Sequence, residues 1–470
     1  MALASMAVLL SGCMVGPKYV KPTVPMAPSF KEDSAWQTAK PADTALRGDW
    51  WTIFGDEQLN SLEPQVAASN QTAAAAEARF REARSQIKFS KAALAPTIGA
   101  APFAGGLRNS TNRPYFNSTT TNANGIGDIQ LPLDLSYEVD MWGRIRRGIT
   151  AAREEATASA ADYETALLSL QAELAVDYFE ARAADAEEKL LSDTVKDYDE
   201  AYRITNNRFE GGVSPKSDVD QALTQLQTAR VQESDVAITR AQYEHAIAVL
   251  IGKPPASFSL AVTPLKTEPP AIPPALPADL LQRRPDIASA ERRVAEANER
   301  IGIATAAYYP TISISASVGL EATAFSNLFK ASSLLWSAGP TLSQTLFDNG
   351  RRHSVVEQAR ASYDETAANY RQTTLTAFQQ VEDNLAVLRV LNTEAQQQHQ
   401  ATASAQAAQQ IFNNRYVGGL DTYLQVVTAQ QTALANERND IDIMRRQMDA
   451  SVLLVKALGG GWDTTKLPKL

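Results

Sequence analysis

Apolar and polar residues alternate with a period of two from Ile129 to Met141. The odd-numbered positions in this stretch are apolar or aromatic, and the even-numbered ones are polar except for Pro132. The same alternation runs from Thr311 to Leu320. A period of two predicts β-strands with one apolar face and one polar face. Less regular strands are expected at 96–107 and 337–347, so the pattern predicts two hairpins with about four strands.

A strand of this length with one apolar face is what a transmembrane β-barrel requires, although a soluble sheet packed on a core has the same pattern. Four strands do not close a barrel, because closed barrels begin at about eight strands. Open strand edges are not tolerated in lipid, so several chains are expected to share one barrel. On this interpretation Asp134, Glu138 and Asp140 line a pore, and the Asn-, Thr- and Ser-rich residues 108–125 form an exposed loop.

The rest of the chain is dominated by polar, alanine-rich segments that predict long helices. These helices are expected at 64–95, 144–206, 215–251, 285–307, 351–413 and 421–458. The two longest would each span about 95 Å at 1.5 Å per residue. Neither return helix is long enough to pair with the whole of its partner. Each long helix is therefore expected to be faced by two shorter helices stacked end to end.

The chain contains two copies of one unit. Residues Asn206–Val213 and Asn413–Leu420 are near-identical turns, 207 positions apart, and each contains a Gly-Gly pair. Paired glycines provide the left-handed backbone that ends a helix and reverses the chain. Further upstream the offset becomes 214, where Pro96-Thr97-Ile98 matches Pro310-Thr311-Ile312. The two repeats are expected to span residues 56–252 and 278–458.

The last expected helix has heptad spacing along two neighbouring lines. The first line is apolar throughout and consists of Leu420, Val427, Leu434, Ile441, Met448 and Val455. The second line has a polar centre and consists of Leu424, Gln431, Arg438, Arg445 and Val452. An apolar line beside a line with a polar centre predicts a helix that packs against a neighbouring helix on one side and lines a water-filled tube on the other. An ordinary solvated flank explains the second line equally well.

The segments outside the repeats differ in composition. Residues 1–12 are small and apolar and end at Leu10-Ser11-Gly12-Cys13, which predicts a signal peptide followed by a lipid-modified cysteine. No Lys or Arg precedes Cys13, although signal peptides usually begin basic, and a buried apolar N-terminus is the alternative. Residues 13–55 are expected to form an extended strap anchored by Trp50, Trp51 and Phe54. The Pro-rich residues 253–277 are expected to form a belt or linker.

Composition and charge exclude several classes of protein. The net charge of −9 argues against nucleic acid, whose binding needs a basic face. Cys13 is the only cysteine, which excludes disulfides within the chain and thiolate metal clusters. His245, His353 and His399 are too scattered for a metal site or a catalytic triad. No enzyme, metal or organic cofactor is therefore predicted, and no run of 18 apolar residues follows the N-terminus.

Several motifs spread over nearly the whole chain resemble the TolC-like outer-membrane factors, the outer-membrane lipoproteins of resistance-nodulation-division efflux systems. They are Cys13–Pro17 with Tyr19 and Pro22, Trp50-Trp51 with Phe54, Asp56 and Leu59, Leu280–Arg292, Ile301–Ala304, Leu346–Arg351, Ala377–Asp383 and Ala457–Trp462. The resemblance implies an α+β membrane protein in which three chains form a 12-stranded β-barrel. That barrel would continue into a 12-helix periplasmic α-barrel. The linker and the tail 459–470 would belong to an equatorial belt.

The resemblance also implies a function and partners. The protein would be a passive exit duct in the bacterial outer membrane for small toxic compounds or drugs. A periplasmic adaptor and a proton-driven inner-membrane transporter would complete the pump. Cys13 would carry diacylglycerol and an N-acyl chain. The alternatives are a lipid-anchored coiled-coil scaffold or adhesin, or a channel for protein secretion or metal export.

The resemblance assigns site residues at the two turns. Adaptor contacts would fall on Gly211, Gly212, Val213, Gly418, Gly419 and Leu420. In the gate, Leu424 matches an apolar constriction, whereas Thr428 and Gln431 stand where relatives have an acid and an arginine, so that charged latch is absent. Tyr416 and Asp218 match a tether between the hairpins. The hypothesis is that packing of Leu424 and a Tyr416–Asp218 hydrogen bond hold the gate closed.

Overall fold

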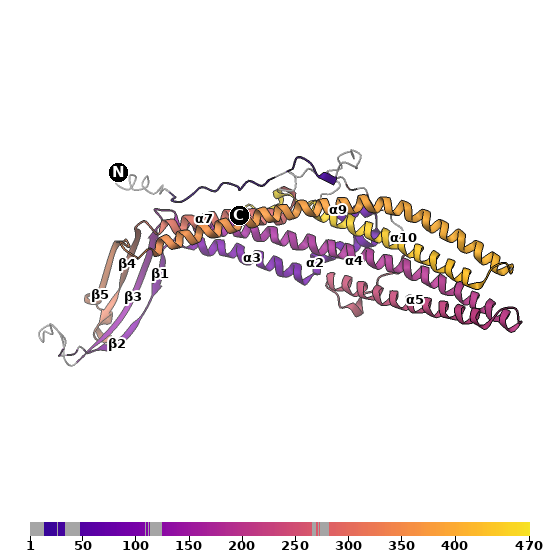
Figure 1. Cartoon of the computed structure of the whole chain (residues 1–470). Coiled ribbons are helices and arrows are strands. Elements are labelled where there is room, and N and C mark those ends of the chain that lie inside the picture. Colours follow the sequence, from indigo (N-terminus) through magenta and orange to yellow (C-terminus); the bar gives the residue numbers. More distant parts are fainter. Residues whose placement is uncertain are drawn as a thin grey trace.

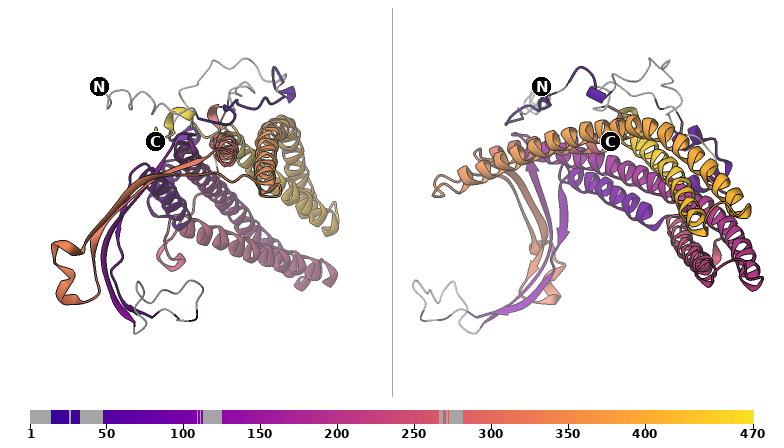
Figure 2. Two further views of the ribbon diagram at one scale, coloured as in Figure 1. Left: turned by 90° about the vertical axis from the view of Figure 1, so that its left-hand side faces the viewer. Right: turned by 45° about the vertical axis from the view of Figure 1, so that its right-hand side comes forward.

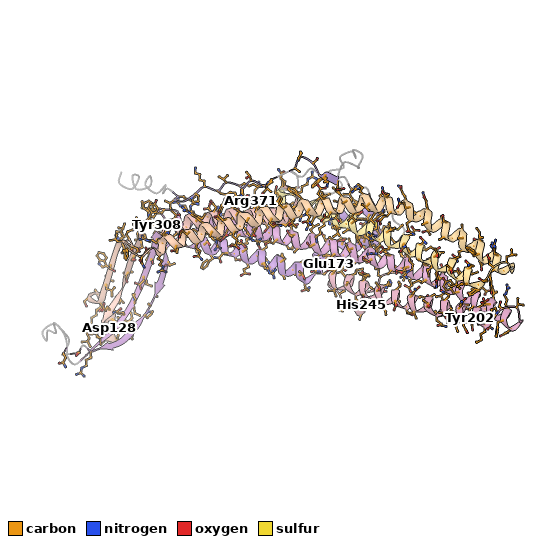
Figure 3. The ribbon with its side chains drawn as sticks, in the orientation of Figure 1. Asp128, Glu173, Tyr202, His245, Tyr308 and Arg371 are labelled. Atoms are coloured by element: carbon orange, nitrogen blue, oxygen red, sulfur yellow. The ribbon has the colours of Figure 1, made fainter. Side chains whose placement is uncertain are left out.

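The protein is a long, curved helical body with a β-sheet at one end and two helical turns at the other (Figure 1). The computed structural model describes residues 14–25, 27–32, 48–108, 110, 112, 125–265, 269, 270, 272 and 282–470. In Figure 3, Asp128 marks the sheet end, Tyr308 the junction of sheet and helices, and Tyr202 the opposite end. Cys13, the signal peptide and most of the expected loop at 108–125 lie outside the described residues. Among the described residues, no helix is apolar and long enough to cross a bilayer.

The helices follow the expected order. They are α2 (Glu57–Ser69), α3 (Gln71–Ala92), α4 (Arg144–Glu210), α5 (Lys216–Leu250), α7 (Pro285–Ala306), α8 (Phe325–Leu328), α9 (Arg351–Val417) and α10 (Tyr423–Ala457). Short 3-10 helices are η2 (Trp50–Phe54), η3 (Pro255–Ser257), η4 (Ala331–Ser333) and η5 (Thr464–Lys466). The helix expected at 64–95 is in fact two helices, because the Asn70 side chain accepts the N–H groups of Thr72 and Ala73 and so starts a new helix.

The sheet is an antiparallel meander that joins the two repeats. Its strands are β1 (Thr97–Ala100), β2 (Phe103–Leu107), β3 (Ile126–Val139), β4 (Thr311–Ala322) and β5 (Leu334–Ser343). Both β1 and β2 pair with β3, which pairs with β4, which pairs with β5. β1 and β2 share one continuous register on β3 and are separated at Pro102, which lacks the N–H that a ladder needs. The sheet is therefore four strands wide, as predicted, although β5 begins and ends earlier than expected.

The register places the apolar residues of neighbouring strands on one face. Leu133 lies opposite Val318, which lies opposite Trp336, and the Trp336 side chain is 75% exposed. The other face carries polar pairs such as Asp134 with Ser317. The two-faced sheet is confirmed. Its apolar face is covered by no part of the described chain, which is the reverse of a sheet packed on a soluble core.

The carboxylates at the end of β3 do not all face a pore. Both carboxylate oxygens of Asp140 accept backbone N–H groups at the start of α4, from Ile145 and Arg146 at 3.0 Å. Glu138 pairs with Arg144 at 2.6 Å. The expectation that Asp140 lines a pore is therefore wrong. Its charge instead satisfies the free N–H groups of a 67-residue helix at its positive end.

Each long helix is faced by two shorter helices stacked end to end, as predicted. α3 and α5 contact α4, while α7 and α10 contact α9. At the first junction the Asn70 amide donates to the Leu250 carbonyl at 2.8 Å. At the second, Arg284 donates to the Ala457 carbonyl at 3.0 Å. Figures 1 and 2 show the resulting layer of long helices.

A glycine in left-handed conformation closes each junction. Gly252 has φ +71° and lies against the Ser69 carbonyl, and the equivalent Gly459 has φ +96° and lies against the Arg283 carbonyl. A Cβ at either position would overlap that carbonyl oxygen. The duplication has therefore preserved a close backbone contact as well as a turn.

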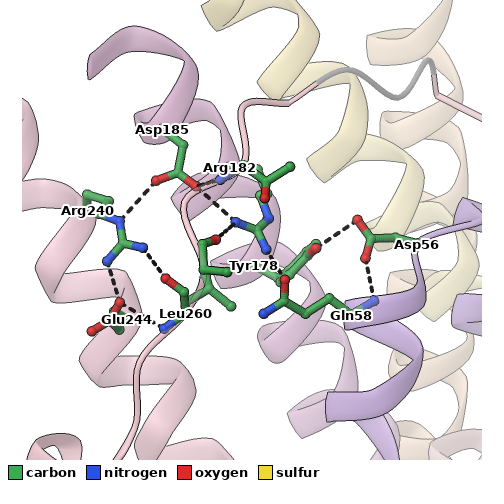
Figure 4. Close-up of polar contacts among 10 residues, drawn as sticks. Asp56, Gln58, Tyr178, Arg182, Asp185, Arg240, Glu244 and Leu260 are labelled. Atoms are coloured by element: carbon green, nitrogen blue, oxygen red, sulfur yellow. Dashed lines mark hydrogen bonds and ion pairs between the residues drawn. The ribbon is translucent and has the colours of Figure 1, made fainter. Parts of the chain in front are cut away.

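The middle of the molecule is its largest apolar core. Trp50, Trp51 and Phe54 are buried there and pack beside Tyr178 and Phe179 of α4, so the expected anchoring of the strap is confirmed. In Figure 4, two arginines fix the start of the linker. Arg182 donates to the Ala261 carbonyl, and Arg240 donates to the Leu260 carbonyl at 2.6 Å. Asp185 bridges the two guanidinium groups at 2.9 and 3.0 Å.

The strap runs along α7 and α9 from the sheet junction to the core (Figure 1). Val15 donates its N–H to the Trp142 carbonyl at 3.2 Å, beside the start of α4. Farther along, the N–H groups of Lys31 and Glu32 donate to the Glu382 carboxylate at 2.7 and 3.0 Å. The first described residues are thus held where the sheet meets the helices.

We predict that Gly459→Ala destabilises the protein much more than Gly350→Ala. Both glycines have left-handed backbones, so each alanine adds roughly 1–2 kcal/mol of strain. Only Gly459 also faces a backbone oxygen, since no described residue has an atom within 4 Å of a Cβ at Gly350. The measurement is the midpoint of thermal unfolding followed by circular dichroism. Equal midpoints for the two variants would show that the junction tolerates a methyl group.

A second prediction concerns Glu63, which is fully buried on α2 and has no hydrogen-bond partner on either oxygen in the part of the chain that the structure describes. Burial raises its pKa from 4.5 to about 9. The folded state therefore holds the proton more tightly than the unfolded state, and stability falls as pH rises from about 4.5 towards 9. Glu63→Gln should raise the unfolding midpoint at pH of about 8 and change little at pH of about 4.5. Glu57→Gln, on the exposed start of α2, is the control, and a pH-independent effect of Glu63→Gln would contradict the prediction.

Candidate functional site

The two turns at the far end of the helices have the same backbone geometry. Val213 donates to the Arg208 carbonyl and Leu420 to the Arg415 carbonyl, both at 2.8 Å, which closes a Schellman motif on α4 and on α9. Only the second glycine of each pair is left-handed, with φ +73° at Gly212 and +74° at Gly419. Gly211 and Gly418 keep right-handed backbones. The expectation that both glycines of a pair supply the reversal is therefore corrected to one.

Each turn presents the same kind of surface. Val213 is 69% exposed and Leu420 is 71% exposed, and the neighbouring glycines Gly211, Gly212, Gly418 and Gly419 are exposed as well. An apolar side chain beside bare backbone lets another helix approach closely. The six residues expected to contact an adaptor thus form two equivalent, accessible patches.

A small buried cluster packs the two hairpins against each other behind these turns. It contains Ala222 of α5, Tyr416 of α9, and Tyr423, Val426 and Val427 of α10, with Tyr202 of α4 at its edge. The rings of Tyr416 and Tyr423 lie 5.2 Å apart. Burial raises the pKa of Tyr423 to about 12. The relative position of the hairpins therefore depends on apolar packing around tyrosines.

The expected hydrogen bond between Tyr416 and Asp218 is not formed, so that prediction is wrong. The Tyr416 hydroxyl is buried and has no partner among the described residues. Its ring turns into the cluster, where Arg208 of α4 lies 4.8 Å from the ring centroid. Contacts of the ring with Arg208 and Tyr423 hold the side chain in an orientation in which its hydroxyl reaches no acceptor among the described residues.

The other gate residues lie on one exposed face of α10. Leu424 is 54% exposed, and Thr428 and Gln431 follow it at helical spacing. The Thr428 hydroxyl donates to the Leu424 carbonyl at 2.9 Å, so it is satisfied within its own helix. The face is apolar at Leu424 and uncharged at the next turn.

Farther from the turns, ion pairs join α10 to α4. Arg438 pairs with Glu187 at 2.6 Å, and Arg445 pairs with Glu180. Arg445 also pairs with Asp442 at 2.7 Å. The two arginines of the heptad line with the polar centre therefore form a seam between the two hairpins, whereas Leu424 and Gln431 of that line are exposed. Sequence reasoning missed the acids, although their spacing of seven residues on α4 matches the spacing of the arginines on the antiparallel α10.

This seam carries more acids than bases. Burial, together with the charge of Glu180, raises the pKa of Asp449 to about 7. Burial, with Glu173 and Glu180, likewise raises the pKa of Asp177 to about 7. A cavity of about 420 Å³ lies between α4, α5 and α10 at this level. The seam can therefore take up protons near neutral pH while Arg445 stays charged.

Comparison with known proteins agrees with this geometry. The family model described as outer membrane efflux protein matches residues 62–253 and 276–460. The probable efflux pump outer membrane protein TtgC of Pseudomonas putida is 30% identical, over 98% of this chain and 95% of TtgC. The cation efflux system protein CusC of Escherichia coli is 28% identical, over 97% of each chain.

Solved structures share the fold over nearly the whole length. A membrane protein from Pseudomonas aeruginosa superposes with a TM-score of 0.88 at 29% identity, over 96% of this chain and 98% of that one. The outer-membrane channel OprN superposes with a TM-score of 0.86 at 28% identity, over 96% of this chain and 100% of OprN. With its two-faced sheet, stacked helices and paired turns, the chain belongs to the outer membrane efflux protein family.

Proposed function

We propose that the protein is the exit duct of a tripartite efflux pump. It passes small toxic compounds or drugs across the outer membrane, without catalysing a reaction, from a proton-driven inner-membrane transporter of the resistance-nodulation-division type and a periplasmic adaptor. The observation that carries the proposal is a sheet with an exposed apolar face, continuous with a helical body of about 100 Å. The alternative function, a coiled-coil scaffold, would explain the helices but not a sheet with an exposed apolar face.

The unpaired edges of the sheet support a homotrimer. Among the described residues, no strand pairs with the outer edges of β1, β2 or β5. Three copies would supply 12 strands, which is enough to close a barrel and satisfy every edge in lipid. The same operation would arrange the long helices of three chains as one tunnel.

We expect the inner face of that tunnel to be polar. A hollow of about 1020 Å³ lies along α3, α4, α7 and α9 just below the sheet. Its lining includes Arg79, Glu155, Arg293 and Arg300. Charges of both signs favour water and select weakly among solutes, which suits a passive duct that leaves substrate choice to the transporter.

The course of the strap supports a lipid anchor on Cys13. Met14 lies against Gly143, and Val15 is bonded to Trp142, at the junction of sheet and helices. Trp142 stacks on Tyr309 at 4.7 Å, and such aromatic residues mark the boundary of the hydrocarbon. Diacylglycerol and an N-acyl chain on Cys13, the residue before Met14, would enter the membrane that the sheet would span.

The two exposed turns are the proposed adaptor contacts, through Gly211, Gly212, Val213, Gly418, Gly419 and Leu420. Leu424 is the proposed constriction, since it is exposed on the face of α10 that three chains would bring together. Thr428 adds no charge there. These assignments make opening a movement of the α9–α10 hairpin relative to the α4–α5 hairpin.

We expect the detergent-extracted protein to be a trimer of acylated chains by native mass spectrometry. Cys13→Ala should remove the acyl mass without changing the residues that form the sheet edges. Ion conduction by the purified trimer in planar bilayers would then test the duct directly. A stable monomer that conducts no current would favour the lipid-anchored scaffold.

The substrate class needs a cellular test. A strain that lacks its own outer-membrane efflux channels should regain resistance to drugs or solvents when it expresses this chain with its adaptor and transporter. Val213→Asp and Leu420→Asp together should abolish that gain, because each puts a charge on an apolar contact patch. The purified double variant should still conduct. Full resistance in the double variant would show that the turns are not the adaptor contact.

A further inference from the structure

We propose that Arg208 is a positioning residue that holds the two hairpins of one chain together at the gate. It acts through the contact of its guanidinium with the ring of Tyr416. The inference rests on the proposed gating role of the hairpins and identifies what takes the place of the missing charged latch.

The contact joins two helices that are far apart in the sequence. Arg208 is on the last turn of α4, and Tyr416 is on the last turn of α9. The guanidinium carbon lies 4.8 Å from the ring centroid, within the range of about 6 Å for a cation–π interaction. Arg208 Nη1 also donates to the Tyr416 carbonyl at 3.4 Å. One side chain therefore holds both the ring and the backbone of the opposite hairpin.

The surroundings of the contact strengthen it. Tyr416 is only 6% exposed, and the Nε atom of Arg208 is buried without a hydrogen-bond partner among the described residues. In the described part of the chain, no ion pair to a carboxylate is formed by Arg208. Arg208 as a whole is half-buried, and a partly desolvated cation–π contact is stronger than a fully exposed one. The ring is therefore the main partner of this charge.

The equivalent arginine of the second repeat makes a different contact. Arg208 corresponds to Arg415, which pairs with Asp421 of its own hairpin at 2.5 Å on the exposed surface. The position that corresponds to Asp421 is Ser214, which has no charge. The first hairpin thus lacks the local acid, and its arginine reaches the second hairpin instead. Equivalent residues have taken up a local role in one copy and a bridging role in the other.

The contact is coupled to the constriction through one short path. The Tyr416 ring packs on Tyr423 at 5.2 Å, and Tyr423 directly precedes Leu424. Moving the α9–α10 hairpin away from α4 requires separation of Tyr416 from Arg208. Arg208 therefore stabilises the arrangement of the hairpins in this structure, which the proposal takes as the closed one, without itself lining the pore.

The test is single-channel recording of the full-length protein in planar bilayers. Arg208→Ala should raise the open probability about tenfold, the factor that about 1.4 kcal/mol corresponds to. Arg415→Ala is the matched control, because it removes the same side chain from the equivalent position without breaking a contact between hairpins. Equal open probabilities for the two variants would overturn the proposal.

Two further variants separate a latch from general loosening. Tyr416→Leu removes the ring and should raise the open probability as Arg208→Ala does, whereas Tyr416→Phe keeps the ring and should have a smaller effect. The double variant Arg208→Ala/Tyr416→Leu should open no more than the stronger single variant, because both remove one contact. Fully additive effects would overturn the proposal.

Leu424→Ala distinguishes failure of the latch from failure of the duct. It removes the constriction itself and should raise conductance whatever holds the hairpins. If Leu424→Ala conducts more and Arg208→Ala behaves like wild type, the gate stands and the latch is rejected. If no variant conducts, the proposed duct is rejected, and the latch is rejected with it because it rests on the duct.

Discussion

The backbone groups along the two outer edges of the sheet constrain the rest of the molecule. A strand edge carries N–H and C=O groups that water cannot reach inside a bilayer, and leaving them unpaired costs several kcal/mol each. In the described chain, the edge strands β1, β2 and β5 have partners on one side only. A protein of the outer membrane with such a sheet has to obtain the missing partners from other copies of itself. The proposed trimer, its tunnel and its gate all follow from that requirement.

The helical body solves a second problem, which is length. A 67-residue helix cannot fold back on an equally long partner when the return segment has only 35 residues. Two short helices stacked on each long one supply the missing surface, and each stack needs a junction where helix ends meet closely. Gly252 and Gly459 provide that closeness, since neither has a side chain to keep the facing carbonyl away. The large apolar core lies at the level of these junctions, as does the start of the linker that Arg182 and Arg240 bind.

The chain has two similar hairpins whose side chains make different contacts. The backbones of the turns are the same in both copies, down to one left-handed glycine in each. The side chains around them differ: Phe209 in one copy corresponds to the buried Tyr416 in the other, and Ser214 corresponds to Asp421. Contacts between the hairpins depend on these differences. If the two hairpins were identical, both arginines would make the same local contact and neither would bridge to the other hairpin. The ion pairs of Arg438 and Arg445 with α4 extend the same seam away from the turns.

The sequence by itself determined the elements and the repeat. Period-two alternation, proline and glycine positions, and the 207-residue offset act locally or through simple periodicity, so strands, long helices and turns could be read directly. The family followed from motifs, and so did the positions of the turns. Boundaries were less secure: the break at Asn70 and the true start of β5 depend on capping and pairing rather than on pattern.

Only the tertiary structure decided which side chains meet across the hairpins. The sequence suggested a Tyr416–Asp218 hydrogen bond, but the Tyr416 ring contacts Arg208 and Tyr423 instead. It also suggested that Asp140 faces a pore, whereas Asp140 binds the start of α4. Both errors have one physical cause. Pattern fixes the face of an element on which a residue lies, but packing of neighbouring elements fixes its rotamer and therefore its partner.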